Sequence, residues 1–280
     1  MNLLNLGCGS NFHKDWINID FVSNSNFVHA HNLLEGIPFE AQSIEVVYHS
    51  HVLEHFTKVD GIQFIKECYR VLKPQGVVRI AVPDLERIAK EYIKNLDMAV
   101  SGQAEAKYNY NWIVLELFDQ MIRNESGGDM KAYLHQETIP NESYVFGRIG
   151  MEGKKIRTGF LNKQQKLSQV KREPGSLFKR IKRYLRKMFK KVNGSPSQTK
   201  LSDIDRKALQ IGQFRRGGEI HQWMYDRYSL PELLKSVGFE DIKVCSAFES
   251  RIPNWESFQL DVVNGDIIKP DSLFIEAIKP

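Results

Sequence analysis

The first twenty residues constrain the fold of this chain more than any other segment. Residues 3–6 form an apolar run, Gly7 and Gly9 follow it, and residues 16–20 form a second β-rich run that ends in Asp20. A short strand, a glycine turn and a second strand ending in a carboxylate are typical of an open α/β sheet that binds a nucleoside at its carboxyl edge. Because glycine has no Cβ atom, the backbone can turn sharply there and a ligand can lie against it. Asp20 is then placed to accept hydrogen bonds from both hydroxyls of a ribose.

The spacing of these residues disfavours two common nucleotide sites. A dinucleotide fingerprint would need glycine at position 12, where Phe12 stands, and the chain contains no G-x-x-x-x-G-K-[S/T] phosphate loop. Gly7 and Asp20 are 13 residues apart, against about 20 in the dinucleotide pattern. Little room is left for a helix that would bind a pyrophosphate. A ribose-bearing cofactor without phosphates is favoured, and S-adenosylmethionine is the common one; a plain strand-to-turn glycine pair is the alternative at this point.

The α/β pattern continues to residue 96. Residues 44–55 read as a strand followed by a polar corner, and residues 56–73 carry apolar side chains at a helical period. Residues 74–76, Pro-Gln-Gly, are expected to end that helix. Residues 77–82 form a β-rich run that leads into Pro83-Asp84 and a further helix. Alternating strands and helices of this kind predict a mostly parallel sheet.

Six motifs in this order resemble the class I S-adenosylmethionine-dependent methyltransferases: LNLGCGS, WINID, IPF, VVYHSHVLEH, ECYRVLKPQGVVRIAVPD and HQWMYDRYSLPELLKSVGF. The resemblance is to the methyltransferase-11-like branch, small bacterial enzymes associated with cell-surface glycan and lipopolysaccharide pathways. It covers about 1–95 and 217–280. It implies a Rossmann-like, seven-stranded, mostly parallel sheet with helices on both faces, S-adenosyl-L-methionine as the cofactor and methyl transfer as the activity.

The resemblance also assigns the cofactor-binding residues of the first two strands. Gly7, Cys8 and Gly9 would form the loop beneath the methionine and the ribose. Asp20 would bind the ribose, and Phe21 would flank the adenine.

Two further positions follow the third and fourth strands. Asn32 and Leu33 fall where an acid commonly contacts the adenine amine; Asn32 is not an acid, but its carbonyl oxygen can accept the same hydrogen bond. Ser50 and His51 would lie at the end of the fourth strand, beside the methionine part of the cofactor and the methyl acceptor.

Methyl transfer needs little acid–base chemistry, because the sulfonium donor is already activated and the protein mainly aligns the reactants. A hydroxyl acceptor also benefits from a general base, worth roughly 10²–10⁴-fold. The candidates are His51, Asp84 at the end of the fifth strand, and His221 just before the last core helix. Trp223 beside His221 would suit the face of a sugar. The alternative is that Trp223 and Tyr225 belong to the core and that His221 orients a loop.

A second chemistry fits one short motif. Residues 51–55, His-Val-Leu-Glu-His, match H-x-x-E-H, the inverted zinc-protease signature, which needs both histidines on one helical face. The motif falls at the end of a predicted strand, so we expect only part of it to be helical. Glu54 and His55 are expected to begin or cap the next helix, with His55 as a structural histidine. No carboxylate cluster has metal-ligand spacing, so no metal ion is expected.

Length and cysteine content bound the class of protein. A chain of 280 residues with 42% hydrophobic residues can hold one α/β domain and an insertion. The three cysteines, Cys8, Cys68 and Cys245, are widely spaced and odd in number, which favours a reducing cytoplasm. Met1 leads almost directly into the expected first strand, so no signal peptide is expected. No apolar run reaches the roughly 18 residues of a membrane span.

The predicted core is interrupted once. Residues 1–96 and 217–280 would form the cofactor-binding core. Its last helix would start at Pro231, with Ser229 as its cap, and end at Gly238, and strands would follow at 240–247 and 272–278. Residues 97–216 would form a largely helical insertion between the fifth strand and the last core helix. Within it, residues 108–123 read as a helix. Residues 154–200 are expected to be mobile, because 159–176 and 193–197 lack hydrophobic periodicity.

Positive charge is concentrated in the insertion. The whole chain has 39 basic and 34 acidic residues, but residues 154–192 have 15 basic residues and one acid, which leaves the rest of the chain net acidic. Residues 177–192 carry an i, i+3, i+4, i+7 apolar stripe and eight basic residues. Such a helix can lie on an anionic membrane surface. It can also pack on the protein or on a partner, whereas nucleic acid is disfavoured because no recognisable RNA module accompanies the charges.

These patterns together predict O-methylation of a sugar or lipid-linked glycan by a cytoplasmic protein, with the inner face of the membrane as a partner surface. A small metabolite or RNA is the alternative acceptor. A different class of protein, a cofactor-binding module whose insertion recruits a partner without catalysis, is the second alternative.

Overall fold

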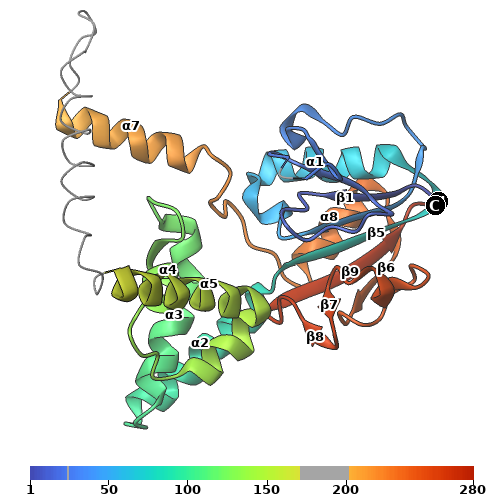
Figure 1. The fold of residues 1–280 in the computed structure, drawn as a ribbon. Coiled ribbons are helices and arrows are strands. Elements are labelled where there is room, and N and C mark those ends of the chain that lie inside the picture. Colours follow the sequence, from blue (N-terminus) through green and yellow to red (C-terminus); the bar gives the residue numbers. More distant parts are fainter. Residues whose placement is uncertain (24, 171–201) are drawn as a thin grey trace, which may run out of the picture.

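The computed structural model describes residues 1–23, 25–170 and 202–280. Seven strands form one sheet in the order β3-β2-β1-β4-β5-β9-β6 (Figure 1). Strands β1 to β5 are parallel, and β9 is antiparallel to both of its neighbours. The bounds are β1 (Leu3–Leu6), β2 (Ile17–Asp20), β3 (Val28–Ala30), β4 (Ile44–Ser50), β5 (Leu72–Pro83), β6 (Glu240–Cys245) and β9 (Ser272–Ile278). The predicted seven-stranded, mostly parallel sheet is confirmed.

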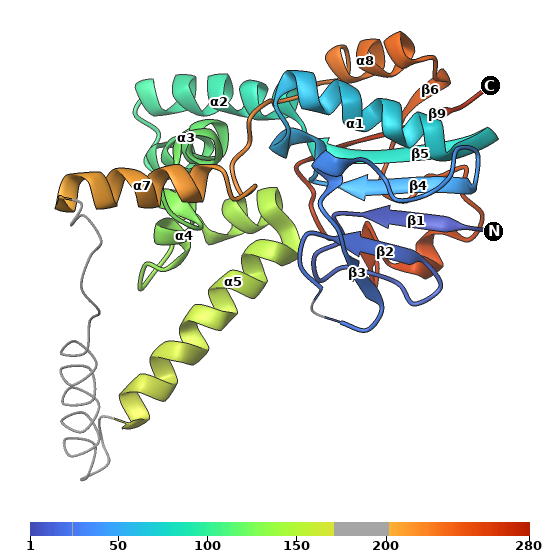
Figure 2. The same ribbon diagram turned by 90° about the horizontal axis from the view of Figure 1, so that it is seen from above.

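Central strands of this sheet are apolar because both of their faces are covered. All four residues of β1 are buried, and Leu4 of β1 pairs with Ile17 of β2 and with Val47 of β4. The parallel strands end at one edge, and their arrowheads point toward the helices of the insertion (Figure 2). This edge therefore brings the glycine loop and the end of β4 close to the insertion.

Helices cover one face of the sheet. Helix α1 (Lys58–Val71) and helix α8 (Ser229–Val237) pack beside each other there (Figure 2). Thr57 caps α1, its hydroxyl accepting from the backbone N–H of Asp60. The chain passes from Val71 directly into β5, so α1 ends before the expected Pro-Gln-Gly stop, which lies inside the strand.

The second face is covered mainly by side chains of loops. Trp16 packs edge-on against Tyr48, Trp255 and Phe258, and the last two belong to a 3-10 helix, η3 (Trp255–Phe258). We expected helices on both faces; here the chain between β1 and β2 is too short to form one, and residues 246–262 supply the cover. The short strands β7 (Val262–Val263) and β8 (Asp266–Ile267) continue this segment toward the insertion.

One buried arginine connects this cover to the sheet. Arg79 of β5 is fully buried and lies 2.8 Å from a carboxylate oxygen of Asp261 and 2.8 Å from one of Glu276. Its guanidinium lies 4.4 Å from the ring centroid of Trp255. Tyr48 donates a hydrogen bond of 2.6 Å to the other oxygen of Asp261. Residues 246–262 are thus held by charge as well as by apolar contact.

The insertion leaves and rejoins the core at two residues that lie side by side in space. Asp84 and Tyr225 form a parallel β-bridge, and the N–H of Leu85 donates to the carbonyl of Tyr225 at 3.0 Å. The intervening helices lie together beyond the carboxyl edge of the sheet (Figure 1). Their bounds are α2 (Leu85–Val100), α3 (Ala106–Ile122), α4 (Gly128–Leu134), α5 (Glu142–Val170) and α7 (Asp203–Arg215).

Helix α5 carries the described part of the basic segment. It has a kink at Gly150, whose backbone is not helical, and continues to Val170. Residues 159–170 are therefore helical, although they lack an apolar stripe. The ring of Phe160 stacks on the ring of His135, with centroids 4.4 Å apart. The amphipathic segment 177–192 lies outside the described residues, as do residues 171–176 and 193–200. None of the helices in the described ranges has the length and hydropathy needed to cross a membrane.

Candidate functional site

The glycine loop has the geometry expected of a binding loop. Gly7 and Gly9 both have positive φ angles, 61° and 55°. A Cβ atom at Gly7 would lie 2.4 Å from the side chain of Val52, whereas at Gly9 it would meet no atom of the described residues within 4 Å. The N–H of Gly9 donates to the Asp20 carboxylate at 2.7 Å. Gly7 thus allows close packing, and Gly9 leaves open space beside the predicted ribose-binding acid.

A cavity of about 460 Å³ lies against this loop. We call it the loop cavity; its walls are residues 7–11, the end of β4, one side of α5 and parts of the segment 260–269. Asn11 fixes the loop to that segment by donating to the carbonyl of Leu260 at 2.6 Å. Of the predicted cofactor residues, five line the loop cavity: Gly7, Cys8, Gly9, Ser50 and His51.

The predicted adenine contacts are not brought into the loop cavity. Asp20 lies beside it through the hydrogen bond to Gly9, but Phe21 is 69% exposed. Asn32 caps the short helix η1 (Leu33–Glu35) by accepting from the N–H of Leu34. Leu33 packs against the core. The places of Phe21, Asn32 and Leu33 in adenine binding stay predictions.

A second cavity, of about 490 Å³, lies between the core and the insertion. We call it the insertion cavity; it is lined by residues of α3, α4 and α5, by His55 and by His221. The two cavities share His51, Glu152 and Lys269 among their lining residues. A ligand in one cavity would therefore be a near neighbour of a ligand in the other.

His51 has a fixed position between the two cavities. It follows β4 with a φ of 54°, and its N–H donates to the carbonyl of Ala81 at 2.9 Å. Its Nε2 lies 2.8 Å from the Ser272 hydroxyl, and its Nδ1 lies 3.3 Å from Oε1 of Glu54. Burial lowers the pKa of His51 well below its ordinary value, so the ring is neutral near pH 7.

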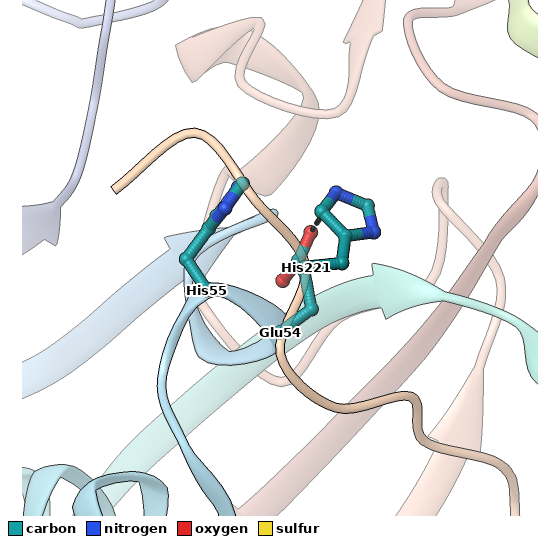
Figure 3. A group of neighbouring side chains, drawn as sticks. All are labelled: Glu54, His55 and His221. Atoms are coloured by element: carbon teal, nitrogen blue, oxygen red, sulfur yellow. Dashed lines mark ion pairs between the residues drawn. The ribbon is translucent and has the colours of Figure 1, made fainter. Parts of the chain in front are cut away.

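Glu54, His55 and His221 meet at the wall of the insertion cavity (Figure 3). Glu54 and His55 belong to a 3-10 turn, η2 (Leu53–His55), and the N–H of Gln222 donates to the carbonyl of Glu54 at 2.7 Å. The Nε2 of His221 lies 4.0 Å from Oε1 of Glu54, and the two imidazole rings lie 4.8 Å apart, nearly perpendicular. Backbone contacts therefore hold residues far apart in the sequence at one point.

Burial dominates the electrostatics of this cluster. It raises the pKa of Glu54 to about 8 and lowers the pKa of His55 to about 4. It also lowers the pKa of His221 well below the usual value. Without a bound cation the imidazoles are thus neutral near pH 7, and much of the carboxyl population carries a proton.

The sequence pattern H-x-x-E-H does not form the helix that a zinc protease needs. His51 follows a strand in a left-handed conformation and His55 lies in a 3-10 turn, so the two rings do not share a helical face. The expectation that Glu54 or His55 would begin or cap the next helix is wrong, because Thr57 provides that cap. His55 does make one structural bond, its Nδ1 lying 3.2 Å from the carbonyl of Ile220.

Two other candidates lie away from the cavities. Asp84 caps α2 by accepting from the N–H of Arg87, and it is absent from the described walls of both cavities. Trp223 likewise lines neither described wall, and the ammonium of Lys58 lies 5.1 Å from its ring centroid. Tyr225 is buried in the core, as the alternative reading expected.

The sequence interpretation missed Glu54 as a site residue. Its one local signal was a glutamate set between two histidines. Its contact with His221 joins residues 167 positions apart and has no local signature.

Comparisons with known proteins match the N-terminal part of the chain. Residues 4–80 match the family model described as a methyltransferase domain. A probable S-adenosylmethionine-dependent methyltransferase of Mycolicibacterium smegmatis is 39% identical over 54 residues, 19% of this chain and 20% of that protein. The match therefore spans about one fifth of the length of this curated relative. The matched domain implies S-adenosylmethionine as the cofactor, and it contains the glycine loop, Asp20, Ser50 and His51.

Two solved structures align over almost the whole chain but at low identity. A SAM-dependent methyltransferase from Archaeoglobus fulgidus is 11% identical, with 99% of this chain and 86% of that chain covered and a TM-score of 0.39. A SAM-dependent methyltransferase from Thermotoga maritima, titled a possible histamine N-methyltransferase, is 11% identical, with 100% and 82% covered and a TM-score of 0.39.

Proposed function

We propose that this protein is an S-adenosylmethionine-dependent methyltransferase that methylates a hydroxyl group of a sugar or lipid-linked glycan. The observation that carries the proposal is the meeting of the two cavities at His51. One cavity lies against the glycine loop of the matched methyltransferase domain, and the other lies against the insertion.

The residues around the loop cavity fit the donor. Gly7, Cys8 and Gly9 would lie beneath its methionine and ribose, and Asp20 offers carboxylate oxygens for the ribose hydroxyls. The open space beside Gly9 allows a ligand to approach the backbone. When bound, the cofactor supplies an electrophilic methyl group on its sulfonium.

The insertion cavity fits a polar acceptor. Its walls carry both charges, including Arg123, Lys131, Glu219 and Asp271. Such walls can donate and accept hydrogen bonds with a polyhydroxylated ligand. His51, which lines both cavities, is placed to take the proton of the acceptor hydroxyl. The other predicted bases are less well placed: Asp84 lies elsewhere, and His221 lies deeper, against Glu54.

Donor binding is tested by isothermal titration of the purified chain with S-adenosylmethionine. The Asp20→Ala variant is expected to bind at least about 10-fold more weakly, because hydrogen bonds to a charged group contribute about 1.5–3 kcal/mol. Asp97→Ala, which removes an exposed carboxylate on α2, is the matched control and should bind normally. Absence of binding to the wild type, together with no effect of Asp20→Ala, would refute the donor assignment.

The acceptor is tested by transfer of a labelled methyl group into cell-envelope glycan, lipid, RNA and small-metabolite fractions. We expect the label in a glycan or glycolipid, and we expect conditions that cleave methyl ethers to release it. His51→Asn should lower kcat, measured at saturating donor concentration, about 10²–10⁴-fold. Label confined to RNA or to a small metabolite would replace the sugar acceptor, and donor binding without any transfer would favour a cofactor-binding module.

The proposed acceptor also gives the basic segment a function. Residues 177–192 would bring the protein to an anionic membrane surface at which lipid-linked glycans are presented, on the cytoplasmic side. Flotation with anionic vesicles should recover the full chain but not a form lacking 177–192, and neutral vesicles should recover neither. Equal recovery of both forms on anionic vesicles counts against this surface.

A further inference from the structure

We propose that Glu54, His55 and His221 bind a divalent transition-metal ion of the zinc class, at a site open to the insertion cavity. This proposal concerns binding alone and does not depend on the proposed methyl transfer. It rests on the geometry of three possible ligand atoms, on unpartnered buried polar groups and on the way the backbone holds the site.

The possible ligand atoms are close enough for one ion. One oxygen of Glu54 and one ring nitrogen from each histidine all lie within 4.8 Å of one another. A tetrahedral ion bound at about 2.1 Å from each ligand places its ligand atoms about 3.4 Å apart. Side-chain rotations that move these atoms by up to about 1 Å would close the site. Figure 3 shows the carboxylate and the two rings gathered at this point.

The cluster contains buried polar atoms that a cation would satisfy. Glu54 is fully buried, and neither of its carboxylate oxygens has a hydrogen-bond partner in the described part of the chain. The Nδ1 of His221, which is 4% exposed, likewise has none among those residues. Buried carboxylates are normally hydrogen-bonded, paired or bound to a metal. His51 offers one partial partner, at 3.3 Å, and leaves the second oxygen of Glu54 without any.

The backbone prepares the histidines for coordination. A carbonyl oxygen can only accept, so the contact of His55 Nδ1 with the carbonyl of Ile220 makes Nδ1 the protonated nitrogen and leaves Nε2 as a free donor of its lone pair. Metal-binding histidines typically make such a second bond, which fixes the ring and its tautomer. The N–H of His221 donates to the carbonyl of Gln120 in α3 at 3.1 Å, so the insertion also positions this ligand.

The positively charged side chains near the cluster are paired with acids, which reduces their repulsion of a bound metal ion. Lys269 lies 3.7 Å from the Glu152 carboxylate. Arg123 lies 3.1 Å from Glu219 and 3.4 Å from Asp119. Each of these positive groups is thus neutralised by an acid of its own.

The ligand types select the metal. Two imidazoles and one carboxylate suit Zn²⁺, Co²⁺ or Fe²⁺, whereas Mg²⁺ and Ca²⁺ prefer oxygen ligands throughout. Three protein ligands leave at least one position for a further donor. Because His55 and His221 line the insertion cavity, the further donor would be an oxygen of water or of a hydroxyl-bearing ligand in that cavity.

The test measures metal binding by the full chain without any cofactor. After treatment with a chelator, titration with Zn²⁺ should give one equivalent, and Co²⁺ should give visible d–d bands of a low-symmetry site with nitrogen and oxygen ligands. Glu54→Gln and His221→Ala should each weaken Zn²⁺ binding at least about 100-fold, since even residues behind metal ligands contribute 10–100-fold. His29→Ala, at an exposed histidine, is the matched control and should bind normally.

Absence of Co²⁺ bands from the wild type would mean that the cluster holds no metal. Equal Zn²⁺ binding by His29→Ala and His221→Ala would mean the same. Circular dichroism of each variant separates lost binding from lost folding. Failure of methyl transfer would leave these results unchanged, so the two proposals fail separately.

Discussion

Arg79 is fully buried and contacts no proposed ligand. Replacing it by methionine should severely destabilise the core. Methionine keeps most of the apolar stem, so the main change is the loss of the guanidinium. That group pairs with Asp261 and Glu276, both almost fully buried. It also donates to three backbone carbonyls, those of Ser246, Ala247 and Glu249.

The expected magnitude follows from these contacts. Removing one partner of a buried ion pair costs about 3–5 kcal/mol, because the remaining charge is left without compensation. Loss of the three hydrogen bonds to the carbonyls adds about 1 kcal/mol each. We therefore expect Arg79→Met to lower the free energy of unfolding by about 6–8 kcal/mol, a large part of the stability of an ordinary domain. Because Leu260 and Asp261 line the loop cavity, affinity for S-adenosylmethionine should fall as well.

Urea unfolding followed by circular dichroism measures this effect through the transition midpoint and slope. Arg206→Met is the control: Arg206 is 59% exposed and its partner Asp203 is 97% exposed, so a change within about 1 kcal/mol is expected. Arg79→Lys keeps the charge but not the planar fork, and should be intermediate. A loss below about 1 kcal/mol in Arg79→Met would refute the view that this ion cluster holds residues 246–262 on the sheet.

Three further outcomes are expected. Burial raises the pKa of the Cys8 thiol to about 12, so its reaction with a disulfide reagent at pH 8 should be about 10³-fold slower in the native state than in urea; equal rates would contradict its burial. In thermal melts, Gly150→Ala should lower the free energy of unfolding by about 2–4 kcal/mol, because φ is 57° and the new Cβ would lie 2.4 Å from the segment after β8. Gly159→Ala, in the same helix, should leave the stability unchanged or raise it slightly. Burial raises the pKa of Asp271 to about 7; the folded state therefore holds this proton more tightly, and the free energy of unfolding should fall as pH rises from about 4 to about 7. Asp271→Asn should reduce this slope in urea titrations, exposed Asp266→Asn should not, and an unchanged slope in Asp271→Asn would refute the assignment.

Local patterns predicted the parts of the fold that local chemistry determines. The glycine loop, the strand ending at Asp20 and the helix predicted at 108–123, observed as α3, were readable because turn geometry and periodicity lie in adjacent residues. The cap role of Asp84 was readable in the same way, since an aspartate three positions before Arg87 at a helix start is a typical N-cap. Its place as a catalytic base stays a prediction.

Contacts between distant segments were not predictable from the sequence. The cover of the second face depends on Trp255 meeting Trp16, and nothing near either tryptophan indicates the other. The position of His221 beside Glu54 likewise requires the insertion to return along the 3-10 turn. Periodicity also could not show that residues 159–170 are helical, because their apolar side chains do not recur at a helical spacing.

The β-bridge between Asp84 and Tyr225 has a consequence for how such a molecule can change. This bridge holds the two ends of the insertion side by side at the core. The register of the sheet therefore does not depend on the length or sequence of the chain between them. Substitutions, deletions or exchange of that region can reshape the insertion cavity while the glycine loop stays in place. Under the proposed function, selection could therefore alter the range of acceptors almost independently of donor binding. There are two exceptions. One side of α5 also lines the loop cavity, and at the cluster of Glu54 the returning segment places His221 against the core.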